Sequence, residues 1–150
     1  MVKVVRTLLI GGLMLILLAG CTSGTLHHSY TFSGEGEHWS AIYSETFTEE
    51  PVRREGKATY YTPSSEYTFQ LAYKGDTGDL KSIKTFTFGF DSGGHSASQT
   101  LEGPIRLDTL RMRGTGGGLM NREDSIITVN VEWDGQREQF ELMTDGAEPE

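Results

Sequence analysis

The amino-acid sequence predicts an all-β fold, on the basis of three observations. Thr, Tyr, Phe, Val and Ile gather in short runs separated by glycine-rich breaks, as is typical of strands and turns. Within these runs apolar side chains recur at every second position, as at Tyr67, Phe69, Leu71 and Tyr73, which is the pattern of a strand with one buried face. No run after residue 21 has the period of a helix. We therefore predict a single antiparallel β-sandwich, for which an immunoglobulin-like topology remains open, with a small barrel as the alternative.

The strands are separated by recognisable turns, of which Asp134-Gly135 is the clearest. This pair lies between the alternating run Ile127–Trp133 and a second run that contains Phe140 and Leu142. An Asp-Gly pair tolerates the positive φ angles of a two-residue type I′ turn, so the sequence predicts a hairpin here. Further strands are expected at about residues 30–33, 38–47, 54–62, 86–90 and 96–102.

The segment 105–113 is less regular than its neighbours. Ile105 and Leu107 share one parity, whereas Leu110 and Met112 share the other. A bulge or tight turn near Asp108-Thr109 would allow both pairs to face the core.

The first twenty residues have the organisation of a secretory signal peptide. Lys3 and Arg6 precede an uncharged run, rich in Leu, Ile and Gly, that is too short to span a bilayer. The run ends in Leu18-Ala19-Gly20-Cys21, and Cys21 is the only cysteine in the chain. These four residues resemble the lipobox of bacterial lipoproteins, in which the cysteine thiol receives a lipid and the signal is cut before it. We therefore expect a lipid on Cys21 and a chain anchored to the extracytoplasmic face of the cell membrane.

This interpretation divides the chain into a signal peptide (1–20), a lipidated tether (21–29), the β-sandwich domain (30–145) and an acidic tail (146–150). Loss of the signal would change the formal net charge from −8 to −10. Such an acidic protein would be repelled by nucleic acid, which we exclude as a partner. Anionic headgroups would repel it too, so membrane attachment is expected to come from the lipid. A flexible link of eight residues spans about 15 Å, so the domain would lie close to the bilayer.

Two further segments resemble a known family. FSGEGEHWSAIYS, near the start of the mature chain, and EDSIITVNVEWDGQREQFEL, at its end, are similar to segments of small, uncharacterised lipoproteins of Gram-positive bacteria. Those proteins pair an F-S-G…W opening with an E-W-[ND]-G terminal hairpin. The resemblance implies a lipid-anchored β-domain and brings no catalytic residue with it.

Asp91-Ser92-Gly93-Gly94, followed by His95, is the strongest indication of an enzyme. The first four residues resemble the D-S-G-G of serine proteases, where glycines and backbone amides form the oxyanion hole. The chain is short for that fold, and two of the three upstream histidines lie in the tether. We therefore interpret the segment as a turn. A small extracytoplasmic hydrolase or metal-dependent enzyme that uses the Asp91–His95 loop is the alternative.

Metal and phosphate sites are not expected. The four histidines lack the spacing of zinc ligands and are interpreted as solvated or weakly packed. GDTGD, residues 75–79, lacks the pattern of an EF-hand and reads as a surface turn. The glycine-rich segment 114–124 lacks the G-K-[ST] ending of a phosphate loop and is expected to be a long connection between strands. No cofactor is predicted.

The candidate binding residues are arginines and tyrosines. Arg111, Arg113 and Arg122 lie around the glycine-rich segment, where they could receive a carboxylate or phosphate, or could pair across strands with acids such as Glu132 or Glu141. Tyr60 and Tyr61 are adjacent, so one of them is expected to point away from the core. The sequence therefore favours a non-enzymatic surface domain that binds an envelope protein or peptide.

Overall fold

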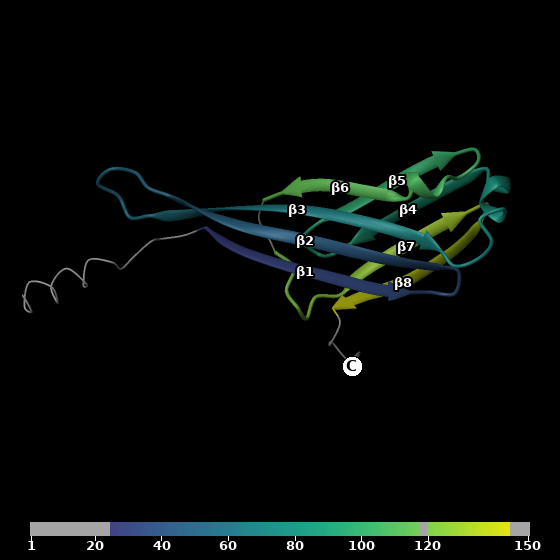
Figure 1. The fold of residues 1–150 in the computed structure, drawn as a ribbon, viewed down its shortest axis with the longest axis horizontal. Helices are drawn as coiled ribbons and strands as arrows, with labels where there is room; N and C mark the ends of the chain where they lie inside the picture. Colours follow the sequence, from purple (N-terminus) through teal and green to yellow (C-terminus); the bar gives the residue numbers. More distant parts are fainter. Residues whose placement is uncertain (1–24, 118–119, 145–150) are drawn as a thin grey trace, which may run out of the picture.

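The computed structural model describes residues 25–117 and 120–144, which form one antiparallel sheet of eight strands (Figure 1). The predicted signal peptide, Cys21 and the acidic tail lie outside the described residues. The all-β prediction is confirmed. Among the described residues the only helical elements are the 3-10 turns η1 (Asp79–Ser82) and η2 (Leu107–Thr109), and none is long and apolar enough to cross a membrane. The strands are β1 (Leu26–Glu35), β2 (Trp39–Val52), β3 (Tyr60–Tyr73), β4 (Thr85–Asp91), β5 (Ser96–Glu102), β6 (Arg111–Gly116), β7 (Ile127–Trp133) and β8 (Gln136–Thr144).

The strand order is β5-β4-β7-β8-β1-β2-β3-β6, and the sheet curls into a half-barrel. Of the two architectures left open, this corresponds to the barrel alternative and not to a sandwich of two separate sheets. The sheet has two halves, β5-β4-β7-β8 and β1-β2-β3-β6. They are joined into one sheet by the pairing of β1 with β8, through Phe32 opposite Thr144 and Ser33 opposite Met143. We call these two residue pairs the seam. The outermost strands, β5 and β6, form the two edges of the sheet.

The core lies on the inner surface of the curled sheet and is mainly aromatic. Trp39 of β2 packs against Phe86 of β4 with ring centroids 5.0 Å apart, and Tyr43 packs against Phe90 at 4.9 Å. These contacts join the two halves of the sheet across the interior. The buried side chains of this core cluster are those of Phe32, Trp39, Ala41, Tyr43, Phe69, Leu71, Leu80, Ile83, Phe86, Phe88, Phe90, Ile105, Leu110, Ile127, Val129, Val131, Phe140 and Leu142.

The predicted Asp134-Gly135 hairpin is confirmed. Trp133 pairs with Gln136, so the turn has two residues, and both have positive φ angles of 45° and 84°. Asp134 also links this turn to β4, because its Oδ1 accepts hydrogen bonds from the backbone N–H groups of Lys84 (3.0 Å) and Thr85 (3.2 Å).

The interrupted segment 105–113 contains a tight turn, as predicted. The 3-10 turn η2 changes the parity of the chain, so that Ile105 and Leu110 are both buried. The prediction that both pairs would face the core is only partly correct, because Leu107 lies on the turn itself and is 48% exposed, whereas Met112 is half-buried.

Three predicted boundaries differ from the structure. Strand β1 begins at Leu26, so residues 26–29 are paired strand and not tether, because they pair with residues 46–49 of β2. Residues 54–59, predicted as strand, belong to the loop between β2 and β3, where Gly56 has a φ of 72°. Residues 114–116, predicted as part of a loop, continue β6 alongside β3.

The hairpin of β2 and β3 extends beyond the neighbouring strand β1. Leu26, the first residue of β1, lies opposite Glu49, yet β2 continues to Val52 and pairs there with Tyr60. Figure 1 shows these two strands and their loop extending beyond the start of β1. We call residues 51–62 the hairpin tip.

Candidate functional site

The outward surface of β1, β2, β3 and β6 carries side chains in regular cross-strand rows. One row runs from Ser33 through Ile42 and Gln70 to Arg111, and the next ends in Arg113. Successive side chains of a strand point to opposite faces of the sheet, so these residues alternate in sequence with the aromatic residues whose side chains are buried. We call this surface the outer face; it contains Ser33, Ser40, Ile42, Ser44, Thr46, Glu66, Thr68, Gln70, Ala72, Arg111, Arg113 and Thr115.

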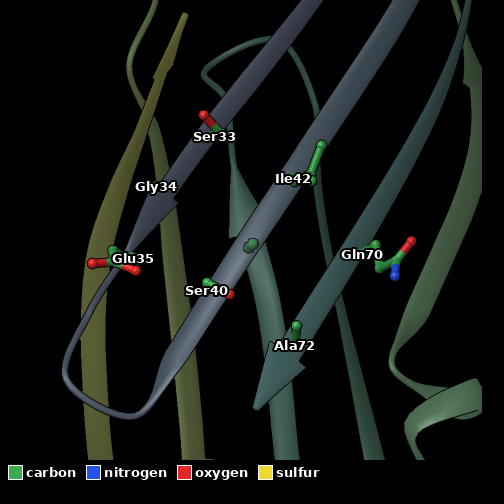
Figure 2. Close-up of a pocket in the computed structure, with 8 residues that line it drawn as sticks. Ser33, Gly34, Glu35, Ser40, Ile42, Gln70 and Ala72 are labelled. Carbon is green, nitrogen blue, oxygen red and sulfur yellow. The ribbon is translucent and has the colours of Figure 1, made fainter. Parts of the chain in front are cut away.

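Two shallow depressions lie on the outer face. The first, of about 340 Å³, is formed by β1, β2 and β3, and Figure 2 shows Ser33, Ile42 and Gln70 around it. The second, of about 510 Å³, includes Thr68 and Arg113 among its lining residues. Hydroxyl and amide groups therefore surround an isoleucine that is 51% exposed. This combination of apolar and polar atoms suits contact with another protein or a peptide.

The structure brings together two of the three candidate arginines. Arg111 and Arg113 both lie on the outer face of β6, where Arg111 donates a hydrogen bond to Gln70 Oε1 at 2.9 Å. Arg113 has no acidic partner among the described residues. Arg122 lies apart, in the connection to β7, where its backbone N–H donates to Ser125 Oγ.

The expected pairing of these arginines with Glu132 or Glu141 is not found. Glu132 lies 3.5 Å from Arg137 of β8, in the other half of the sheet. The alternation of a strand shows which face a side chain occupies but not which strand is its neighbour, so the sequence did not identify Arg137 as the partner of Glu132.

The candidate tyrosines lie on the hairpin tip, away from the arginines of β6. Tyr60 and Tyr61 pair with Val52 and Pro51, and both tyrosines are 44% exposed. The expectation that one of them points away from the core is met by both, because the hairpin at this level extends beyond the core. The Arg54 guanidinium lies over the Tyr60 ring, 5.6 Å from its centroid.

The Asp91–His95 loop is a tight turn at the end of β4. Ser92 Oγ accepts a hydrogen bond from the His95 backbone N–H and donates one to the His95 carbonyl, each at 3.0 Å. Asp91 Oδ1 accepts from the Gly93 N–H at 2.8 Å. Both polar side chains therefore stabilise the backbone of the turn, and neither contacts the His95 imidazole.

The imidazole of His95 instead enters a cluster of buried polar groups that sequence reasoning missed. Glu45 of β2 is only 2% exposed; its Oε1 lies 3.1 Å from His95 Nε2, and its Oε2 accepts a hydrogen bond from Asn121 Nδ2 at 2.7 Å. Ser65 Oγ lies 3.1 Å from the same His95 nitrogen. A signal was present in the sequence, because Glu45 shares the inward parity of Tyr43 and therefore had to be buried.

This cluster has the residue types of a catalytic triad but a different arrangement. In a triad the acid binds one imidazole nitrogen and the nucleophile binds the other, so that a proton can pass through the ring. Here both Glu45 and Ser65 approach Nε2 of His95. The geometry therefore satisfies buried polar groups of β2, β3 and the loop before β5, and it differs from a triad in leaving the acid and the hydroxyl on the same imidazole nitrogen.

Tyr43 lies beside this cluster and is completely buried. Burial, together with the nearby negative charge of Glu45, raises the pKa of the Tyr43 phenol far above its ordinary value. The phenol is therefore neutral at physiological pH.

The remaining histidines form no metal site. His38 Nδ1 lies 2.9 Å from Glu138 Oε2, and its ring packs edge-on against Trp133. His27 and His28 are exposed on β1. The described part of the chain contains no group of three or more His, Cys, Asp or Glu side chains placed to hold a metal ion. The interpretation of the histidines as solvated or weakly packed is wrong for His95, whose side chain is 14% exposed and contacts Glu45. The His38 side chain is 43% exposed, as expected, and also contacts Glu138.

Comparison with family models, with curated proteins and with solved structures found no match.

Proposed function

We propose that this protein is a lipoprotein of the cell envelope, anchored through a lipid on Cys21, whose β-domain binds an envelope protein or peptide without catalysing a reaction. The signal-like start of the chain and the sequence around Cys21 support the anchor. The outer face supports the binding role, and the observation that carries it is the position of Arg113. Arg113 lines the second depression, on an acidic protein, and forms no ion pair among the described residues, although Glu66 lines the same depression.

An arginine in this setting is suited to a carboxylate of a partner chain, because a guanidinium binds carboxylates in bidentate geometry. Ile42, near the other depression, adds an apolar contact, and the surrounding hydroxyl groups donate and accept hydrogen bonds. The partner best matched to this surface is a protein segment with an acidic residue next to an apolar one.

The anchor is tested by labelling cells with a fatty-acid probe. The wild-type protein should take up the label, and the Cys21→Ala variant should not. A labelled Cys21→Ala protein would contradict lipidation at this residue.

The binding role is tested by cross-linking and capture from envelopes with the intact lipidated protein. The double variant Arg111→Glu/Arg113→Glu should lose at least ten-fold of the captured partner, which corresponds to about 1.4 kcal/mol. Arg106→Glu/Arg137→Glu is the matched control, since it reverses the charge of two exposed arginines that lie off the outer face and changes the net charge by the same amount. Equal losses in both variants would show that net charge, and not the outer face, governs capture.

The absence of catalysis is tested with Ser92→Ala and Ser65→Ala. Both folded, lipidated variants should capture the partner and give cells the phenotype of the wild type. Loss of the wild-type phenotype in either variant, with capture of the partner unchanged, would favour the hydrolase alternative.

A further inference from the structure

We infer that the hairpin tip, residues 51–62, is a second membrane contact, which lies against the phospholipid headgroups next to the lipid anchor. This inference rests on the proposed anchoring at Cys21. It adds the site and the orientation of contact, which the anchor alone does not determine.

Only a short segment of chain separates the proposed anchor from β1. Cys21 precedes Leu26, the first residue of β1, by five residues, and five residues span at most about 17 Å when fully extended. A lipid on Cys21 would therefore hold the start of β1 within that distance of the bilayer. Leu26 lies opposite Glu49, so the start of β1 and the base of the tip are at the same end of the molecule.

The tip extends beyond the start of β1. From Glu49, strand β2 continues for three residues to Val52, which adds about 10 Å, and the loop continues beyond it. Figure 1 shows that the tip is the outermost described part of this end of the protein. An anchored domain with its long axis directed at the bilayer would thus touch the headgroups with the tip.

The tip contains basic residues and exposed tyrosines. Residues 51–62 contain Arg53, Arg54 and Lys57 and one acidic residue, Glu55, with Glu49 and Glu50 at the base of the tip, in a chain whose formal net charge is −8. A local positive charge on an acidic protein complements anionic headgroups, which would repel the rest of the surface. Tyr60 and Tyr61 are each 44% exposed, and tyrosine is enriched at membrane interfaces because its ring is apolar and its hydroxyl polar.

The opposite end of the molecule carries charges of both signs but, among the described residues, no exposed tyrosine. Its loop after β3 contains Lys74, Lys81 and Lys84 as well as Asp76 and Asp79, and Tyr73 at the end of β3 is half-buried. The tip is therefore the end that suits the bilayer, and the outer face would stand roughly perpendicular to the membrane, accessible from the side.

The experiment uses the full-length lipidated protein in vesicles of phosphatidylcholine and phosphatidylglycerol. Because Cys21 is the only native cysteine and would be acylated, Thr59→Cys supplies one free thiol in the tip for an environment-sensitive fluorophore. Spin-labelled lipids should quench this fluorophore strongly. The same fluorophore at Lys81→Cys, an exposed position in η1 at the opposite end, should not be quenched.

Two variants identify the source of the contact. Arg54→Glu/Lys57→Glu should lose most of the quenching at Thr59→Cys, and the wild-type tip should lose it in vesicles of phosphatidylcholine alone or at high salt. Tyr60→Ser/Tyr61→Ser should reduce it without changing its dependence on salt.

Equal quenching at the two positions, or none at Thr59→Cys, would overturn the inference, and the second result would leave the tip free to contact an envelope protein. Fatty-acid labelling of the same samples reports the anchor separately. A labelled protein without quenching contradicts the tip contact alone, whereas an unlabelled protein contradicts the anchor.

Discussion

His95 Nε2 lies 3.1 Å from Glu45 Oε1, and this contact bridges the open side of the half-barrel. His95 immediately precedes β5, which is one edge of the sheet, whereas Glu45 is in β2, next but one to the other edge. The His95 ring also lies against Gly116 of the edge strand β6. A pair of polar side chains therefore holds the two edges together where no backbone ladder does.

The buried carboxylate of Glu45 should depend on Asn121 for stability. Asn121→Ala removes the hydrogen bond to Glu45 Oε2, and we expect the free energy of unfolding to fall by about 2–3 kcal/mol, since a buried charged group would lose a partner. Urea denaturation measures this loss. Asn130→Ala is the control: Asn130 only accepts a 3.3 Å hydrogen bond from Arg137, so its replacement should change stability by less than about 0.5 kcal/mol. Equal effects would show that the Glu45–Asn121 contact is unimportant.

Gly116 should be required for the position of the His95 ring. A Cβ atom at residue 116 would overlap the imidazole, so Gly116→Ala should displace the ring and destabilise the protein by about 1–3 kcal/mol. Thermal denaturation and the NMR signals of His95 report the two effects. At Gly117 the nearest atom to an added Cβ is 3.6 Å away, so Gly117→Ala should be tolerated. In a His95→Ala background the cost of Gly116→Ala should disappear, and its persistence would place the clash elsewhere.

The burial of Tyr43 should make the protein sensitive to alkali. Its pKa is raised in the folded state, so above about pH 10 the phenol ionises in the unfolded chain only. Stability is therefore present below pH 10 and falls above it, by about 1 kcal/mol between pH 10 and 11. Tyr43→Phe should be nearly neutral at pH 7 and should remove this part of the alkaline loss, as measured by urea denaturation across this pH range. Tyr61→Phe, at an exposed tyrosine, should leave the pH dependence unchanged; a Tyr43→Phe profile identical to the wild type would contradict the prediction.

The type I′ turn should depend on Gly135. Its φ of 84° is strongly unfavourable for a β-branched residue, so Gly135→Val should lower the free energy of unfolding by about 1–3 kcal/mol. Gly135→Asn, which tolerates positive φ, should cost much less. The comparison is made by thermal denaturation, and unchanged stability of Gly135→Val would mean that the hairpin turns at a different pair.

The local pattern of the chain predicted the strands and the terminal hairpin because both depend on residues close in sequence. Alternating aromatic residues identified the inner surface of β3 and β4, and Asp134-Gly135 identified a turn whose geometry only a few residue pairs allow. The seam could not be predicted in the same way, because it depends on which strands become neighbours.

The candidate site was predictable only in part for the same reason. The arginines of β6 were found as a local basic group, but the row that places Ile42 beside Gln70 and Arg111 is a property of the sheet register. Glu45 and Glu138 each occupy an inward position in an alternating strand, and that observation predicts a buried carboxylate. It does not name His95 or His38 as partners, and His38 is 100 residues away from Glu138.

The seam also determines when the fold can be completed. Strand β1 is among the first parts of the chain to be synthesised, whereas its neighbour β8 ends at Thr144. Before β8 is available, β1, β2 and β3 can form a local meander, but one edge of β1 keeps unpaired backbone groups. An exposed strand edge pairs readily with other chains, and contacts between distant parts of a sequence form slowly. A chain truncated before β8 should therefore associate with other copies, so the nine-residue strand β8 covers the edge of β1 that would otherwise pair with another chain.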